Sequence, residues 1–125
     1  MSFKQTHPFE ERFNETQRIM EKYSDRIPVI CEKAKSASKD CPVINKHKYL
    51  VPLDFTIGQF VYVIRKRLKL PPEKAIFIFI NGFIPPSSFL IINMYNSYRD
   101  CDGYLYINYT SLVTTRFHHT SIDSP

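Results

Sequence analysis

The segment TIGQFVYVIRKRLKLPPEKAIFIFI, residues 56–80, carries the strongest folding signal in this sequence. Thr56 can cap a helix, because Gln59 follows it at the spacing of a capping box. Apolar residues then recur at helical spacing, which predicts a helix that ends near Leu68. The prolines of the stretch 70–74 stop this helix, and the apolar run 75–80 indicates a strand. The segment is therefore predicted to fold as a helix followed by a strand.

Two further strands are predicted before this segment, at 26–33 and 47–52. In the second of them Lys48 and Leu50 point to one face, and Tyr49 and Val51 to the other. Pro52 has no backbone donor and indicates an edge strand. Exposed edges invite other chains to pair with them, so apolar side chains on both faces of an edge need an explanation.

The remaining elements complete a known order. Residues 8–24 have an apolar helical stripe, a short helical turn is expected before His7, a short helix is expected at 88–99 and a last strand at 104–109. After the leading helix, this is the order of an α+β fold of the β-grasp type, in which a four-stranded mixed sheet grips one helix. The leading helix is expected to cover the other sheet face.

We divide the 125 residues into three parts. Residues 1–24 form an N-terminal helical extension, 25–110 the β-grasp domain, and 111–125 a flexible C-terminal tail. No apolar run approaches the ~20 residues that a membrane-spanning helix needs, and the N-terminus has no apolar signal region. Cys31, Cys41 and Cys101 form no CxxC pair, which favours free thiols in a reducing cytoplasm.

The formal net charge of +5 is uneven along the chain. Residues 27–75 hold ten basic and four acidic side chains, whereas 1–26 are neutral and 76–125 have a net charge of −1. This basic middle could meet acidic peptides, anionic lipid or nucleic acid, or be a solvated surface. The run RKRLK, 65–69, has no accompanying RNA-binding motif, so we expect no nucleic-acid partner.

The sequence offers little for catalysis. Cys101 with His118 or His119 lacks a third orienting group, and the two histidines lack the companions of a metal site. The three glycines form no phosphate-binding loop. We expect neither an enzyme nor a metal or other cofactor.

The chain resembles the autophagy-related eight family of ubiquitin-like modifiers, the relatives of GABA-receptor-associated protein and microtubule-associated-protein light chain. The resemblance spans residues 7 to 109 almost without gaps. It rests on the segment 56–80 and on HPFEERF (7–13), YSDRIPVICEKA (23–34), KYLVP (48–52) and DGYLYINY (102–109). It implies a ubiquitin-like β-grasp with two added N-terminal helices, and a role in autophagosome formation and cargo recruitment.

The resemblance also implies a peptide-binding site. The family binds short motifs of an aromatic residue, two spacers and an aliphatic residue, often preceded by acidic residues. Such a peptide would add as a strand to the edge at 48–52. The implied aromatic pocket comprises Glu15, Ile19, Pro28, Ile30, Lys48, Leu50 and Tyr104. The implied aliphatic pocket comprises Tyr49, Val51, Pro52, Phe55, Phe60 and Val63. Contacts to the acidic flank are implied for Arg26, Lys46, Lys48 and Arg67.

Some of these assignments have alternatives. A role in the core alone is the alternative for Phe60 and Val63, and likewise for Pro28 and Ile30. The family's second docking face, for helical motifs, corresponds to Ile76, Phe77, Ile78 and Phe79. A buried strand explains the same four residues.

The C-terminus departs from the family. Its members are trimmed behind a glycine by a cysteine protease, and activating and conjugating enzymes then join that glycine to phosphatidylethanolamine. Here the corresponding position is Arg116, a shift of two reaches Phe117-His118, and no glycine follows Gly103. No lipidation glycine is predicted, so those enzymes and a phosphatidylethanolamine membrane are partners only if the tail is processed and conjugated.

Two functions stay open at this point. One is a lipid-conjugated modifier on autophagosome membranes that binds cargo receptors and adaptors. The other is a soluble, non-lipidated adaptor or decoy. A cytoplasmic monomer is expected in either case, with autophagosome association expected for the family.

Overall fold

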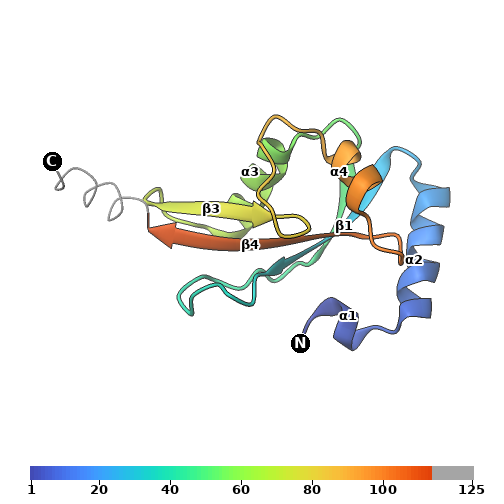
Figure 1. Cartoon of the computed structure of the whole chain (residues 1–125), viewed down its shortest axis with the longest axis horizontal. Helices are drawn as coiled ribbons and strands as arrows, with labels where there is room; N and C mark the ends of the chain where they lie inside the picture. Colours follow the sequence, from blue (N-terminus) through green and yellow to red (C-terminus); the bar gives the residue numbers. More distant parts are fainter. Residues whose placement is uncertain (114–125) are drawn as a thin grey trace, which may run out of the picture.

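The computed structural model describes residues 1–113 (Figure 1). Its elements are α1 (Phe3–Thr6), α2 (Phe9–Lys22), β1 (Arg26–Lys33), β2 (Lys48–Pro52), α3 (Ile57–Leu68), β3 (Lys74–Phe79), α4 (Ile91–Tyr98) and β4 (Leu105–Val113). The element order agrees with the order predicted from the sequence. None of the helices in this part of the chain is both long and apolar enough to cross a bilayer.

The four strands form one mixed sheet in the order β2-β1-β4-β3. β1 runs parallel to β4, while the β1–β2 and β3–β4 pairs are antiparallel. This topology, with α3 across one face of the sheet, is the predicted β-grasp (Figure 1). β1 and β2 are the first two strands in sequence, yet β4 takes the central position beside β1.

The last strand is longer than predicted. β4 continues to Val113, because Ser111, Leu112 and Val113 pair with the first residues of β3. The predicted tail of 111–125 therefore begins with three strand residues, and 114–125 lie outside the described residues. His118 and His119 also lie in that undescribed part, as do Arg116 and Phe117, the positions compared with the lipidation glycine.

α3 is positioned by its first turn, as the sequence predicted. The Gln59 backbone N–H donates to the Thr56 hydroxyl at 3.2 Å, and the Gln59 side chain accepts from the Thr56 N–H at 2.8 Å. These two bonds complete a capping box, and Lys69 closes the helix in a left-handed conformation. The helix buries Phe60 and Ile64 against the sheet, with Val29, Leu105 and Tyr109 opposite.

The leading helix covers only one end of the second sheet face, which corrects the expectation that it covers the whole face. α2 lies across one end of the sheet, and α1 lies beside it (Figure 1). Only Thr16 of α2 is fully buried, while Phe9, Phe13 and Met20 stay partly exposed. The apolar stripe of α2 is thus only half used in packing. Phe3 of α1 is buried with Ile30 and Tyr104 and supplies the remaining cover of the sheet at this end.

Candidate functional site

β2 forms one edge of the sheet. Its pairing within the described residues is with β1 alone, where Leu50 lies opposite Pro28 and Lys48 opposite Ile30. The outward backbone groups of β2 are therefore free of any strand partner in residues 1–113. Such an edge is a template for a further strand.

The side chains of β2 point alternately to two sides of the sheet. Lys48 and Leu50 are exposed, and Lys48 reaches Glu15 of α2 with its Nζ 2.8 Å from Oε1. Tyr49 and Val51 are buried on the α3 side, where the Tyr49 ring meets Phe60 edge to face. The alternation is the one predicted from the sequence.

The first hollow lies between β2 and α2 and has a volume of about 460 Å³. Its lining consists of Glu15, Ile19, Lys46, Lys48, Tyr49, Leu50 and Tyr104. Five of these were predicted for the aromatic pocket. Of the other two predicted residues, Ile30 is fully buried beneath Tyr104 together with Phe3, and Pro28 is buried in β1 opposite Leu50.

A polar group closes one side of the first hollow. Glu15 accepts hydrogen bonds from Lys48 and from the Tyr104 hydroxyl. Burial disfavours its charge, but these two hydrogen bonds outweigh burial and lower the pKa of Glu15. Burial and the same carboxylate raise the pKa of Tyr104. The hollow therefore has an apolar floor and a charged rim.

The second hollow lies on the α3 side and has a volume of about 530 Å³. Its lining consists of Phe55, Thr56, Gly58, Gln59, Tyr62, Val63 and Ser87. Phe55 and Val63 were predicted for the aliphatic pocket. The other predicted residues lie elsewhere: Tyr49, Val51 and Phe60 are buried in the core, and Pro52 is half-buried at the end of β2.

The four cations predicted to contact the acidic flank of the peptide lie at different places in the structure. Lys46 and Lys48 border the first hollow, and the Lys46 Nζ lies 5.4 Å from the centre of the Tyr49 ring. Burial raises the pKa of Tyr49 to about 12, and the positive charge of Arg67 on α3 opposes part of this rise. Arg26 lies at the far end of the strand pair, opposite Pro52. Positive charge is therefore concentrated near the start of β2.

The predicted second docking face is split between two faces of β3. Ile78 is buried and Ile76 packs on the core beside α3. Phe77 and Phe79 point to the opposite face because side chains alternate along a strand, and both are half-buried. The four residues therefore do not form one surface.

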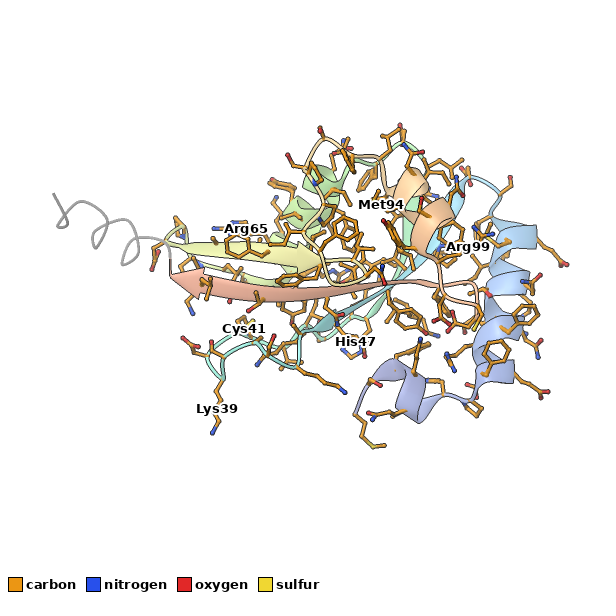
Figure 2. All side chains as sticks on the ribbon, in the orientation of Figure 1. Lys39, Cys41, His47, Arg65, Met94 and Arg99 are labelled. Carbon is orange, nitrogen blue, oxygen red and sulfur yellow. The ribbon has the colours of Figure 1, made fainter. Side chains whose placement is uncertain are left out.

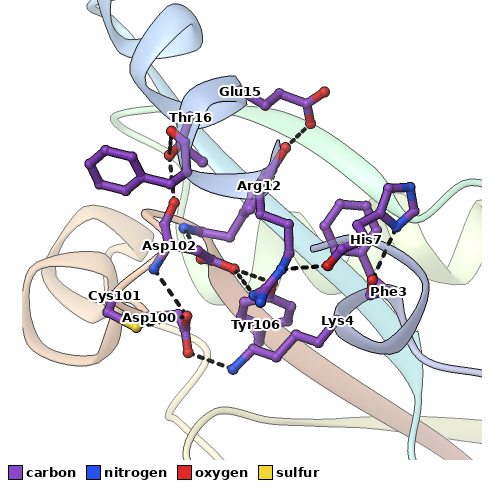
Figure 3. A network of polar contacts seen from close by, with 12 residues as sticks. Phe3, Lys4, His7, Arg12, Glu15, Thr16, Asp100, Cys101, Asp102 and Tyr106 are labelled. Carbon is purple, nitrogen blue, oxygen red and sulfur yellow. Dashed lines mark hydrogen bonds and ion pairs between the residues drawn. The ribbon is translucent and has the colours of Figure 1, made fainter. Parts of the chain in front are cut away.

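A buried polar network fixes α2, and with it one wall of the first hollow (Figure 3). The fully buried Asp102 lies 2.6 Å from Arg12 and accepts a hydrogen bond from the Tyr106 hydroxyl. The Thr16 hydroxyl donates to the Asp102 carbonyl at 2.5 Å. The backbone of Gly103, with φ of +93°, lies directly against Thr16. Lys4 of α1 pairs with Asp100 in the same loop.

The comparisons with known proteins agree with this fold. The family described as autophagy protein Atg8, ubiquitin-like, matches residues 11–115. The chain belongs to the Atg8 family.

Several Atg8 proteins are similar over nearly the whole chain. Autophagy-related protein 8 of Vanderwaltozyma polyspora is 58% identical over 109 residues, which cover 87% of this chain and 91% of that protein. The protein of the same name from Neurospora crassa is 58% identical over 108 residues, 86% of this chain and 88% of its own. The crystal structure of Trypanosoma brucei ATG8 matches with a TM-score of 0.84 and 39% identity, covering 91% of this chain and 97% of that one.

The Atg8 relatives bear on the two functions left open above at the level of the family. They support a ubiquitin-like autophagy protein, with the membrane and vesicle associations that this family has. The alternative of a soluble, non-lipidated adaptor or decoy has no support among them. In the described part of the chain, no three His, Cys, Asp or Glu side chains are placed to hold a metal ion.

Sequence reasoning missed several residues that line the second hollow. Gln59 lies four positions before the predicted Val63 in α3, and Tyr62 lies three positions after Gln59, so the α3 wall of the second hollow was open to prediction. Ser87 was not, because a hydrogen bond from the Gly58 N–H to its carbonyl brings it there from a distant loop.

A third hollow, of about 750 Å³, was also not predicted. It lies between α2 and α4, with Phe13, Met20 and Arg99 among its lining residues.

Proposed function

We propose that this chain binds short linear peptides by strand addition to β2, and thereby recruits cargo receptors and adaptors during autophagosome formation. The recognised motif is an aromatic residue, two spacers and an aliphatic residue. The observation that carries the proposal is an unpaired sheet edge with one hollow bordered by β2 itself and a second hollow on the α3 side of the sheet, lined by Phe55 and Val63.

The backbone of β2 supplies affinity in this proposal. An added strand would form hydrogen bonds with the outward N–H and C=O groups of β2. Because side chains alternate along a strand, successive peptide residues would point to opposite sides of the sheet. One hollow on each side is the arrangement that an aromatic and an aliphatic anchor require.

The charges favour one direction for the peptide. Lys46 and Lys48 border the first hollow, so acidic residues next to the aromatic anchor would be attracted there. We therefore assign the aromatic residue to the first hollow and the aliphatic residue to the second. Lys48 already forms an ion pair with Glu15, so Lys46 is the more available cation for the acidic residues of the peptide.

The proposed partners follow from the peptide and from the family. They are motif-bearing cargo receptors and autophagy adaptors. If the tail is processed, they include the family's cysteine protease and its activating and conjugating enzymes, and a phosphatidylethanolamine membrane if conjugation follows. We propose a cytoplasmic, non-catalytic monomer that associates with autophagosomes.

A titration with a fluorescent acidic peptide carrying this motif tests the proposal. The side chain of Leu50 is 40% exposed and contributes to the first hollow, so Leu50→Ala removes peptide contact without opening the core. Burial of such a side chain contributes about 1.5–3 kcal/mol, so the affinity should fall about tenfold or more. Tyr49→Ala is a poorer probe, because Tyr49 is buried against Phe60.

Two controls make the test specific. Arg99→Ala changes the third hollow and should leave the affinity unchanged. A peptide with an N-methylated residue between its two anchors loses a backbone donor and should bind less tightly. Equal binding by wild type and Leu50→Ala, or no effect of N-methylation at any position between the anchors, would contradict strand addition at β2.

A further inference from the structure

Basic side chains are concentrated at the end of the molecule that lies away from α2. The turn between α3 and β3, the end of β4 and the loop between β1 and β2 all lie at this end (Figure 1). We call this surface the basic end. It comprises Lys33, Lys35, Lys39, Arg65, Lys66, Lys69 and Lys74.

Tertiary contacts hold these three segments together. Arg65 donates to the Lys74 carbonyl at 2.6 Å and so joins the end of α3 to the start of β3. The Lys74 Nζ lies 3.9 Å from Asp40, in the loop between β1 and β2. The Tyr109 hydroxyl ties the same loop to β4, because it donates to the Pro42 carbonyl at 2.7 Å.

The basic end accounts for the charge of the whole chain. The seven named cations and the two acidic side chains of the same segments, Asp40 and Glu73, sum to +5; Lys46 and Arg67 lie in the same stretches of sequence but are not counted among the seven. The formal net charge of the whole chain is also +5, so the remaining residues are neutral in sum. A hydrogen bond from Ser38 lowers the pKa of Asp40, and Lys74 and Lys33 add to the effect.

The charges face solvent in several directions. Lys35, Lys39, Lys66 and Lys69 are exposed, and the other three are half-buried. Arg65 and Lys39 lie on opposite sides of the sheet at this end, and Lys39 extends away from the molecule (Figure 2). A ligand that meets all of them must be broad.

Exposed aliphatic side chains lie among these cations. Val43 is 71% exposed in the loop that Tyr109 holds, and Leu112 is 55% exposed opposite Ala75 of β3. Clusters of four to eight Lys or Arg side chains are typical of surfaces that bind anionic lipids, and apolar side chains among them add partitioning into the headgroup region.

We propose that the basic end binds the surface of a membrane that carries anionic lipids. Each cation near such a surface is attracted within about one Debye length, ~10 Å at moderate salt. A membrane is an extended anionic plane, which fits charges spread over the region 65–74, the region 33–39 and both sides of the sheet better than one acidic peptide does. The proposal is independent of peptide binding at β2.

Sedimentation of the full chain with lipid vesicles tests this inference. The vesicles consist of phosphatidylcholine with or without phosphatidylserine, at low and at high salt. We expect binding only to the vesicles with phosphatidylserine, and weaker binding at high salt. The double variant Lys35→Glu, Lys39→Glu should lose binding by about tenfold or more, since each cation near the surface contributes severalfold to the affinity.

A matched control changes the same charge at the other end. The double variant Arg18→Glu, Lys22→Glu alters two exposed cations of α2 and should keep most of the binding. Thermal unfolding of both variants checks that they fold. Because Lys35 and Lys39 lie outside the hollows beside β2, the peptide titration should be unaffected by the first variant.

Three results would overturn the proposal. The first is no binding of wild type to phosphatidylserine vesicles at low salt. The second is an equal loss in the two double variants, which would indicate an effect of net charge alone. The third is release from the vesicles by an equal charge concentration of polyglutamate or RNA, which would indicate another class of polyanion.

Discussion

Gly103→Ala should release α2 from the sheet, because Gly103 packs directly against this helix. An alanine Cβ at this position would lie 2.3 Å from the Thr16 hydroxyl oxygen and 2.8 Å from the Thr16 Cβ. Real contacts are never this short, so the helix or the loop must move. The movement would break the hydrogen bond from Thr16 to the Asp102 carbonyl. It would also shift Glu15 and Ile19, which line the first hollow.

The expected cost has two parts. The positive φ of +93° costs an alanine about 1–2 kcal/mol. Overpacking adds about 1–3 kcal/mol, and the lost hydrogen bond adds about 1 kcal/mol. The free energy of unfolding should therefore fall by about 3–6 kcal/mol, a large part of the 5–15 kcal/mol that is usual for a domain.

Gly82→Ala is a matched control. Its φ of +83° gives the same backbone cost, but nothing lies within 4 Å of the added Cβ. This variant should lose only about 1–2 kcal/mol. The difference between the two variants isolates the contact with α2.

Urea denaturation and the peptide titration measure the two effects. Gly103→Ala should shift the midpoint further than Gly82→Ala and should also weaken peptide binding, whereas Gly82→Ala should bind normally. Thr16→Ala should cost less in the Gly103→Ala background than alone, because the two sites are in contact. Equal midpoints for the two glycine variants would refute the reasoning that Gly103 is needed for α2 to dock.

Two further predictions concern the polar groups around α2. Arg12→Met leaves the buried Asp102 without its cation and should lower the free energy of unfolding by about 3–5 kcal/mol. The exposed Arg18→Met should cost less than about 0.5 kcal/mol in the same urea experiment. The pKa of Glu15 is lowered below its ordinary value of 4.5, so its charge stabilises the fold above that value and the effect is lost as pH falls through the lower, folded pKa. Wild type should therefore be more stable than Glu15→Gln at neutral pH, and denaturation curves should converge in acid; a constant difference across this range would contradict the assignment.

Local signals in the sequence determined the elements of this protein. The capping box of Thr56 and Gln59 begins α3, and alternation along 48–52 places Lys48 and Leu50 on one side and Tyr49 on the other. These features depend on residues a few positions apart, where backbone geometry sets the relation between side chains. For the same reason the edge position of β2 and one wall of each hollow followed from the sequence, together with the family resemblance.

Only the tertiary structure decided what lies between the elements. The docking of α2 depends on Arg12 and on Asp102 and Gly103; Arg12 lies 90 residues from Asp102 in the sequence, and the three carry no local pattern. Whether Phe60 lines a hollow or fills the core also depends on its neighbours, because one helical face serves both roles. The basic end has the same origin, since burial and charge depend on which distant segments the fold brings together. Sequence periodicity reports the orientation of side chains within an element, and long-range packing determines what those side chains meet.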